Sequence, residues 1–403
     1  MDMAKPKIRF NGYTEDWEQR KLSEIALQTY GGGTPKTANE EFWKGNIPWI
    51  QSSDLIEERL FNVKPRKYIS QEAISKSSTK LVPQNSIAIV TRVGVGKLAF
   101  MPFSYATSQD FLSLSELKIE PKFAVYALYK MMRLVSNEVQ GTSIKGITKD
   151  ELLAKEILIP DCEEQKKIGA YLHNLDHLIT LHQRKCEQTK TLKKYMLQKM
   201  FPQDGEKVPQ IRFEGFTEDW EQRKFGEIVE KYEDPVETPT EGYTRLGIRS
   251  HAKGTFHSYV EKGKELETAK MFRVAADKFI VNITFGWEHA VAITDENDAG
   301  KLVSHRFPQY SFNAGMEPKF FRYLILDENF KHHLELSSPG GAGRNRVLKL
   351  SDMLQYKMNF PSEAEQKKIA AYFDDLDHLI TLHQRKCDEL KEVKKFMLQN
   401  MFV

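Results

Sequence analysis

The most regular pattern of apolar and polar positions in the chain is helical, and it occurs twice. From Glu164, apolar or small residues recur at steps of three and four, and no proline follows until Pro202. The same pattern returns from Glu365, where 27 of 38 positions are identical at an offset of 201. A helix of this length is a rod of ~57 Å, and its apolar stripe needs another apolar surface to pack against. We therefore predict that the two helices pack on each other as a coiled coil.

The apolar pattern does not determine whether the two helices run parallel or antiparallel. If two equal halves close around a pseudo-twofold axis, the helices run antiparallel, and the equivalent residues His182 and His383 lie near the axis. A polar residue in such a seam can fix the register of the pair. The alternative is that both histidines are partly exposed surface residues.

A second repeat precedes each unique region of the chain. The 20 residues from Pro6 share 15 identities with those from Pro209, at an offset of 203. The chain therefore reads as a tandem duplication in which two framework pieces stayed alike and two inserts diverged. We predict an α+β protein of two pseudo-symmetric halves, each a mixed α/β insert followed by a long helix. The expected segments are a leading segment at 1–25, a first insert at 26–160, a central helix at 161–202, a repeated leading segment at 203–228, a second insert at 229–361 and a C-terminal helix at 362–403.

Both inserts contain short apolar runs that are typical of β-strands. In the first insert, Ser86–Arg92 and Leu98–Phe103 flank a glycine-rich turn, which predicts a hairpin. In the second insert, Lys278–Phe285 and His289–Thr294 predict its counterpart. Each insert ends in a short amphipathic segment before a proline, and this similar layout with different residues indicates one fold that carries two specificities. These closing segments are 147–159 and 347–360.

Composition narrows the class of protein only a little. The 403 residues are 40% hydrophobic and 29% charged, which is ordinary for a globular protein. A formal net charge of +3 excludes a histone-like polycation, although basic residues can still be concentrated locally. Three cysteines (Cys162, Cys186 and Cys387) are too few for a disulfide framework and suit a reducing cytosol. With no apolar run of ~18 residues and no apolar signal core at the start, we expect a cytoplasmic protein without a membrane span.

Enzymatic signatures fail when their spacing is checked. Gly94-Val95-Gly96-Lys97 resembles part of a phosphate-binding loop, but Thr91 occupies the first glycine position and Leu98 replaces the Ser or Thr. His173 and His177 have the spacing of zinc ligands on a helix, but the second copy has Asp374 in place of the first histidine. We therefore predict no catalytic residue and no metal site in this chain.

Two further candidates on the repeated helix have structural explanations. Glu164-Gln165-Lys166 could be half of a nuclease motif. It lies at the start of a helix, however, where the helix dipole stabilises acidic residues. We expect it to be a solvated first turn. Cys186 and Cys387 are equivalent positions, and we expect them to be small core residues.

The basic residues are concentrated in particular stretches of the inserts. From Arg59 to Phe100, eight Lys and Arg residues stand against Glu72 alone, a local charge of +7. Gly340–Arg346 places two arginines around an asparagine, which suits phosphate clamps and base-edge donors, and Gly141–Gly146 holds the parallel position in the first insert. The alternatives are flexible polar loops or solvated turns. We predict DNA contacts from Lys64, Arg66, Lys67, Arg92, Lys97, Ser143, Lys145, Arg245, Arg249, His251, Lys253, Arg344, Asn345 and Arg346.

The order of the repeats and their residue sequences resemble those of a known family. EQKKIGAYLHNLDHLI, its second copy and the repeated TEDWEQRK segments are similar to the specificity subunit of type I restriction-modification systems. Gly32-Gly33-Thr34-Pro35 and Ile47-Pro48-Trp49-Ile50, together with Ser53-Asp54-Leu55, are similar to a common opening of that family's target recognition domains. The resemblance covers essentially the whole chain. The second insert departs from it, because it lacks this opening and has Tyr243–Ile248 instead.

The resemblance implies a function and a set of partners. Each target recognition domain would read one half of a bipartite, asymmetric target in double-stranded DNA, and the helices would set the gap between the half-sites. Two methyltransferase subunits and further restriction subunits would join the chain in a bacterial or archaeal cell. S-adenosylmethionine, ATP and Mg²⁺ would be held by those partners, which would also flip out and methylate the target adenine. The helix positions expected to contact the partners are Ile168, Tyr171, Leu175, Leu178, Ile369, Tyr372, Leu376 and Leu379.

Two other classes of function compete with this interpretation. A coiled-coil scaffold without direct sequence readout would use the same helices but would bind duplex DNA weakly and without sequence preference. A self-sufficient nuclease or methyltransferase would need a carboxylate-metal or cofactor motif, and the sequence offers none.

Overall fold

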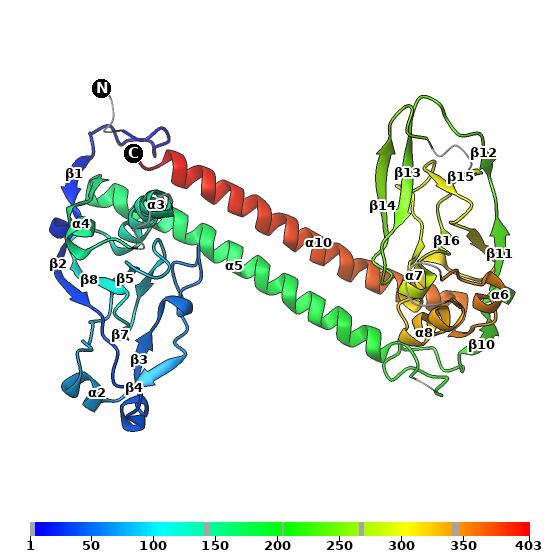
Figure 1. Ribbon diagram of the computed structural model, residues 1–403, viewed down its shortest axis with the longest axis horizontal. Helices are drawn as coiled ribbons and strands as arrows, with labels where there is room; N and C mark the ends of the chain where they lie inside the picture. The colour runs from blue at the N-terminus through cyan, green and yellow to red at the C-terminus, as the bar shows by residue number, and fades with distance from the viewer. Residues whose placement is uncertain (1–4, 141–145, 204, 266–269, 341–345) are drawn as a thin grey trace. The chain divides into compact units, whose positions relative to one another are not determined.

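The computed structural model describes residues 5–140, 146–203, 205–265, 270–340 and 346–403. The chain divides into two compact units, whose elements are labelled in Figure 1. Unit 1 consists of the chain up to Arg184 together with His383–Val403, and unit 2 is Lys185–Leu382. The division therefore falls inside the two long helices, so each unit contains parts of both.

The two long helices lie where the repeated pattern predicts them. Helix α5 spans Cys162–Lys199 and helix α10 spans Glu363–Asn400, each with 38 residues. In unit 1, the Asp176 carboxylate contacts Lys394 and the imidazole of His182 contacts that of His383. As the residue number rises on one helix it falls on the other, so the helices pair antiparallel. The predicted fold class, two similar mixed α/β halves with antiparallel long helices, is confirmed.

Each unit contains a four-stranded antiparallel sheet with the same order of strands. In unit 1 the order is β2-β8-β5-β6, and in unit 2 it is β11-β19-β16-β17. The predicted hairpins are β5–β6 and β16–β17. In each hairpin, the first strand is central in its sheet and the second is at the edge. The bounds are β2 Ala26–Gly31, β5 Ser86–Val90, β6 Leu98–Met101, β8 Phe111–Leu117, β11 Val229–Tyr232, β16 Lys278–Val281, β17 Val291–Ile293 and β19 Gln309–Phe312.

The additional sheet of each unit differs, and this is where the two inserts diverge. Unit 1 has a three-stranded sheet in the order β4-β3-β7, whereas unit 2 has five strands in the order β12-β15-β18-β13-β14. The bounds are β3 Ile47–Ile50, β4 Lys67–Ile69, β7 Ala106–Thr107, β12 Pro235–Val236, β13 Tyr243–Ile248, β14 Thr255–Val260, β15 Met271–Arg273 and β18 Leu302–Ser304.

A two-stranded sheet joins the leading segment of each unit to its closing segment. Strand β1 pairs antiparallel with β9, and β10 pairs in the same way with β20. The bounds of these strands and of the short helices beside them are β1 Glu18–Lys21, α1 Leu22–Ile25, α4 Lys149–Ala154, β9 Glu156–Ile159, β10 Glu221–Lys224, α6 Phe225–Ile228, α9 Leu350–Met353 and β20 Lys357–Phe360. The remaining helices are η1 Glu40–Trp43, η2 Ser52–Asp54, α2 Gln71–Lys76, α3 Pro121–Gln140, η3 Gly286–Glu288, α7 Pro318–Leu324 and α8 Glu328–Leu336.

The end of one long helix completes the core of the unit that the other helix begins. In unit 1, Phe402 stacks on Phe123 with ring centres 5.5 Å apart, and Trp17 packs edge-on against it. In unit 2, Phe201 stacks on Phe320 at 5.7 Å, with Trp220 in the same edge-on position. Large aromatic rings therefore pack in the same way at the two equivalent places.

A buried ion pair fastens each leading segment to the start of the following long helix. The Arg9 guanidinium donates from Nε and Nη2 to the two carboxylate oxygens of Glu164, both at 2.8 Å. Arg212 and Glu365 repeat the arrangement at 2.7 and 2.8 Å. The side chain of Glu164 is fully buried, so the expectation of a solvated first turn is wrong. The carboxylate is buried because the leading segment, 155 residues earlier in the chain, supplies a bidentate partner.

A histidine pair and a cysteine pair lie near the middle of the long helices. The Nδ1 atoms of His182 and His383 are 3.1 Å apart, so one ring donates a hydrogen bond and the other accepts it. The two rings are therefore paired across the helices, as expected for residues near the axis, and both remain partly exposed. Cys186 and Cys387 are both buried, as expected for core positions.

We predict that Glu164→Gln weakens the protein because it leaves the buried guanidinium of Arg9 without its carboxylate. The free energy of unfolding should fall by about 3 kcal/mol, measured by urea denaturation. The control is Glu163→Gln on the same turn, where the carboxylate is 71% exposed and pairs only with Lys166 at the surface. That variant should unfold like the wild type. Equal midpoints for the two variants would contradict a stabilising role of the buried pair.

Candidate nucleic-acid interface

In unit 1, the turn between β5 and β6 meets the segment that closes the insert. The Ile147 amide donates to the carbonyl oxygen of Thr91 at 2.8 Å. A Cβ atom on Gly146 would lie 2.9 Å from that oxygen and 3.5 Å from the Cα atom of Arg92. Only glycine allows the backbone to approach this closely. The closing segment therefore begins directly against the turn.

The short helix η2 brings a third region of the chain to the same turn. A Cβ atom on Gly94, at the tip of the turn, would lie 4.0 Å from Cβ of Ser52. The adjacent Asp54 holds the guanidinium of Arg66, with 3.5 Å between Oδ1 and Nε. The structure thus gathers three of the predicted cations around the turn, although they are far apart in the sequence. They are Arg66, Arg92 and Lys97.

The other two predicted cations of this stretch lie on the chain beside Arg66. The Lys67 ammonium lies 5.6 Å from the ring centre of Trp43 and 5.7 Å from that of Trp49. Such cation–π contacts hold a lysine at a fixed place on the surface. Lys64 is exposed and has no partner that fixes its direction among the residues described for this unit.

Unit 2 repeats the contact between turn and closing segment with different side chains. The Leu348 amide donates to the carbonyl oxygen of Ile283 at 2.9 Å, in the turn between β16 and β17. Arg346 lies 5.5 Å over the ring of Trp287 in the same turn and 3.9 Å from Glu335. The predicted cation Arg346 is therefore held at the place that corresponds to the Gly146 region of unit 1.

The β13–β14 hairpin of the five-stranded sheet adds further predicted residues to this turn. The amides of His251 and Ala252, at the tip of β13–β14, donate to the carbonyl oxygens of Glu288 and His289, both at 2.8 Å. Arg249 lies 5.4 Å over the ring of Phe256 on the same hairpin. Arg245, Arg249, His251 and Lys253 all have exposed side chains, so the hairpin presents cations beside the turn.

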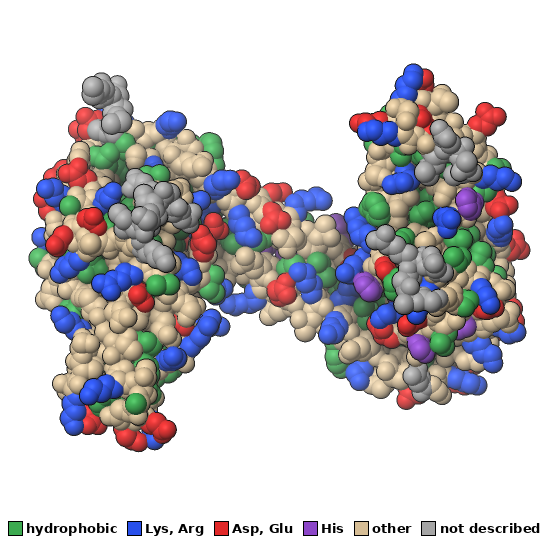
Figure 2. All heavy atoms as spheres, viewed as in Figure 1, with side chains coloured by type: hydrophobic (Ala, Val, Ile, Leu, Met, Phe, Trp, Pro, Cys, Tyr) green, Lys and Arg blue, Asp and Glu red, His purple; other side chains and the backbone are tan. Residues whose placement is uncertain are grey.

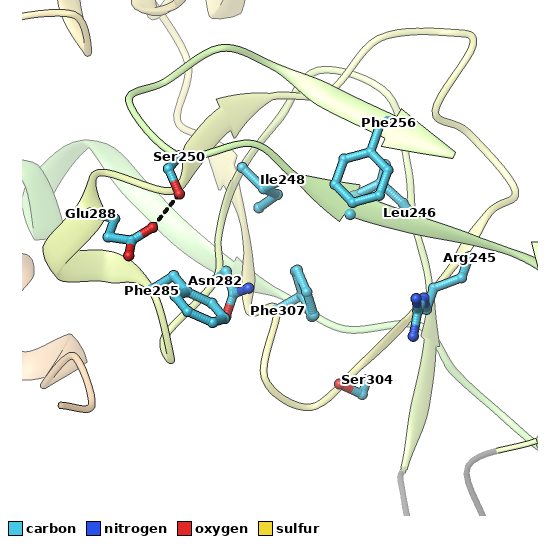
Figure 3. A pocket seen from close by; sticks show the side chains of 11 residues that line it. Arg245, Leu246, Ile248, Ser250, Phe256, Asn282, Phe285, Glu288, Ser304 and Phe307 are labelled. Atoms are coloured by element: carbon cyan, nitrogen blue, oxygen red, sulfur yellow. Dashed lines mark hydrogen bonds between the residues drawn. The ribbon is translucent and has the colours of Figure 1, made fainter. Parts of the chain in front are cut away.

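A hollow of about 330 Å³ lies between this hairpin, the β16–β17 turn and the segment around Phe307. Figure 3 shows Phe256 and Phe307 on opposite sides of it, with Arg245 at one end and Ser250 and Glu288 at the other. A Cβ atom on Gly247 would lie 2.4 Å from the ring of Phe256, so the glycine is what lets this ring lie flat on the strand. Apolar walls next to a cation can contact both a base edge and a phosphate.

A buried histidine sets the shape of the β16–β17 turn. His289 adopts φ 60°, a left-handed conformation, at the end of η3. Its Nε2 atom lies 2.8 Å from the carbonyl oxygen of Ile325 and donates to it. Burial lowers the pKa of His289, because the charged ring would lose its hydration. The turn is therefore held by a neutral imidazole rather than by another exposed cation.

Part of the prediction falls on residues outside those that the structure describes. These are Ser143, Lys145, Arg344 and Asn345.

Three residues of the interface were missed by the sequence reasoning. Arg306 donates from Nη1 to the Thr284 hydroxyl at 3.2 Å, next to the β16–β17 turn. His257 on β14 lies 2.7 Å from Asp298, which is in the connection between β17 and β18. No cluster of charge or glycine marks these positions in the sequence, because the chain brings them together only by folding.

Most of the helix positions predicted to contact partners are used inside the chain instead. Ile168 and Leu175 are buried in the core of unit 1, and Ile369 and Leu376 in the core of unit 2. Tyr171 and Tyr372 are half-buried and pack edge-on against phenylalanines of the leading segments. The prediction is corrected at the four buried positions, because the apolar stripe there covers the core of its own unit, and it stays a prediction at the two half-buried tyrosines. Of the predicted set, only Leu178 and Leu379 remain exposed.

Other apolar side chains stand out from the long helices. They share a spacing of three residues and occupy equivalent positions in the two copies. These exposed residues are Leu192, Tyr195, Val393 and Phe396. A second, narrower stripe of this kind is the signal that the sequence analysis overlooked.

Charge and metal-binding groups complete the description of the surface. Figure 2 shows Lys and Arg side chains on the visible face of both units, interspersed with Asp and Glu. Within the described ranges, no group of three or more His, Cys, Asp or Glu is placed to hold a metal ion. Across those same residues, no helix is long and apolar enough to span a membrane.

Comparison with known proteins gives a consistent result. The family model described as type I restriction modification DNA specificity domain matches residues 14–191 and again 217–392. The type I restriction enzyme MjaIX specificity subunit of Methanocaldococcus jannaschii is 31% identical over 196 residues, which is 46% of this chain and 43% of that protein. The EcoR124I/EcoR124II specificity subunit of Escherichia coli is 30% identical over 43% of this chain and 46% of that protein. The chain thus spans less than half the length of these two relatives in the matching regions.

Longer matches exist at lower identity. The MjaVIII specificity subunit of M. jannaschii is 21% identical over 94% of this chain and 91% of that protein. The crystal structure of a type I restriction-modification system S subunit from M. genitalium matches with a TM-score of 0.62 at 16% identity, over 99% of both chains. At this identity the likeness concerns the fold alone.

Proposed function

Because the chain belongs to the type I restriction modification DNA specificity family, as its repeats indicated, we propose that each unit reads one half of a bipartite target in double-stranded DNA. Unit 1 and unit 2 carry different inserts, so the two half-sites differ and the target is asymmetric. The chain is the DNA-reading subunit of a larger complex.

One observation carries this proposal: the same backbone contact presents different side chains in the two units. Ile147 bonds to Thr91 in unit 1, and Leu348 bonds to Ile283 in unit 2. In each case the turn of the central hairpin and the closing segment form one surface with exposed cations. A constant frame with variable side chains is what two independent readers of sequence require.

The side chains at these surfaces suit recognition of duplex DNA. Lysines and arginines contact phosphates and supply affinity that does not depend on sequence. Arginine also donates two hydrogen bonds to the O6 and N7 atoms of guanine, and apolar surfaces contact the thymine methyl group. Arg346 over Trp287 and Arg245 beside Phe256 combine the two kinds of group in unit 2.

The catalytic steps are assigned to partner subunits. We propose that this chain has no catalytic residue and that methyltransferase and restriction subunits hold S-adenosylmethionine, ATP and Mg²⁺. The exposed apolar residues of the long helices are the proposed contacts with two methyltransferase subunits. Leu178, Val393 and Phe396 serve one such site on unit 1, and Leu379, Leu192 and Tyr195 serve the equivalent site on unit 2.

A scaffold without sequence readout is the competing function. The exposed helix positions suit it equally well, but the cations gathered at the two turns have no role in it. Sequence-independent binding of duplex DNA, even with the methyltransferase present, would favour the scaffold.

Exchange of one insert tests the proposal most directly. Replacing residues 229–361 by the insert of another specificity subunit should change one half of the methylated sequence and leave the other half and the gap unchanged. The measurement is methylation-sensitive long-read sequencing of DNA exposed to the assembled complex. An unchanged motif, or a motif changed in both halves, would refute independent reading by the two units.

Arg346→Ala tests a single predicted contact. Loss of a guanidinium at a base edge should reduce discrimination at one position about 5–150-fold, and only in the half-site read by unit 2. Arg66→Ala is the reciprocal control, since it should affect only the half-site read by unit 1. If both variants weakened both half-sites equally, the cations would be general phosphate contacts.

Lengthening both long helices at their middle tests whether helix length sets the gap. Seven residues inserted after His182 and seven after Leu382 add two turns, ~10.5 Å, at matching levels of the pair. The contacts Asp176–Lys394 and Lys193–Asp377 are kept, because each lies on one side of the insertion. We expect the gap in the methylated motif to grow by about three base pairs at 3.4 Å each. An unaltered gap would refute the proposed spacer role.

A further inference from the structure

Each unit contains a buried aspartate that holds one exposed side chain able to read a base. In unit 1 the pair is Asp54 and Arg66, and in unit 2 it is Asp298 and His257. The carboxylates are 0% and 3% exposed, whereas the side chains that they hold are 67% and 33% exposed. An ion pair that serves only stability has no need of this division between a buried and an exposed partner.

The geometry around Asp54 directs Arg66 outward. Oδ2 of Asp54 accepts a hydrogen bond from the Gln51 amide at 2.9 Å, which fixes the plane of the carboxylate. Oδ1 is buried, has no hydrogen-bond donor among the described residues and lies 3.5 Å from Nε of Arg66. The carboxylate lies nearest to Nε, and no described residue forms a hydrogen bond with the two terminal nitrogens, so these can face a ligand. A fixed fork of this kind matches O6 and N7 of guanine.

The geometry around Asp298 selects one tautomer of His257. Oδ1 of Asp298 lies 2.7 Å from Nε2 of His257 and accepts a second bond from the Thr255 hydroxyl at 2.9 Å. Oδ2 accepts from the Asp295 amide at 3.2 Å. A carboxylate only accepts, so Nε2 carries a hydrogen; in the neutral imidazole, Nδ1 is then the acceptor. That atom can accept from the amino group of adenine or cytosine in the major groove.

We propose that Asp54 and Asp298 are positioning residues for sequence readout, holding Arg66 toward a guanine in one half-site and His257 toward an adenine or cytosine in the other. This inference rests on the proposed function and names the base class that each unit recognises at one position. Neither aspartate touches DNA itself. Each acts by restricting the side chain that does.

The test uses the complete complex with the methyltransferase and a DNA library randomised at both half-sites. For Asp54→Asn, we expect the preference for guanine at one position of the unit 1 half-site to fall about tenfold, with the unit 2 half-site unchanged. Asp298→Asn should do the converse, so each variant is the matched control of the other. Base profiles that stay unchanged at every position, or that change equally in both half-sites, would overturn the proposal.

A second pair of variants keeps the proposal testable if a buried substitution disturbs folding. Arg66→Lys removes the fork at an exposed position and should lose the same guanine preference. Asp54→Asn added to Arg66→Lys should then change the profile no further, because the aspartate acts only through the arginine. A full guanine preference in Arg66→Lys would overturn the assignment. If the wild-type complex methylated no bipartite motif at all, the proposed function itself would fail, which is a different outcome.

Discussion

One aspartate on each long helix receives hydrogen bonds from two directions, and the rest of the architecture depends on it. Asp176 on α5 accepts from the Tyr126 hydroxyl and from the Lys394 ammonium, both at 2.6 Å. Burial, together with the neighbouring carboxylate, raises the pKa of Tyr126, so the phenol keeps its hydrogen for this bond. Asp176 therefore links the insert of unit 1, through Tyr126, to α5, and it links α5 to α10 through Lys394. Asp377 makes the equivalent contacts with Tyr323 and Lys193 in unit 2.

These polar groups explain why the helix pair has one register. Apolar stripes alone allow two helices to slide, whereas a buried lysine must meet its carboxylate or remain unpaired at a high cost. Lys394 has a side chain only 9% exposed, which makes this requirement strict in unit 1. The contact between His182 and His383 adds a further polar constraint at the middle. The helix residues alone set this register, so the inserts could diverge around it.

In both units the leading segment forms a hydrogen bond with the end of a long helix, although that helix precedes the segment in unit 2 and comes from the far end of the chain in unit 1. The Ile211 amide donates to the carbonyl oxygen of Lys199, just before it in the chain, at 2.8 Å. The Ile8 amide makes the same bond, at 2.9 Å, to Asn400 at the other end of the chain. Unit 1 therefore obtains from the C-terminus what unit 2 obtains from the preceding helix. This equivalence is the reason that one duplicated sequence builds two matching frames.

The sequence by itself determined the duplication, both long helices, the central hairpins and the two divergent inserts, because periodicity and repetition are local properties of the chain. Only the tertiary structure decided which polar residues are buried. Glu164 looks like part of a solvated first turn until Arg9 is placed beside it, and Ile168 looks available to a partner until the core of its unit covers it. It also decided which cations face the same surface, since helix η2, which pairs with Arg66, lies against the turn that carries Arg92. Asp298 gave no signal in the sequence, and Asp54 stood out only as part of an opening that resembles the family's. An aspartate acquires a positioning role only from the side chain that folding places against it.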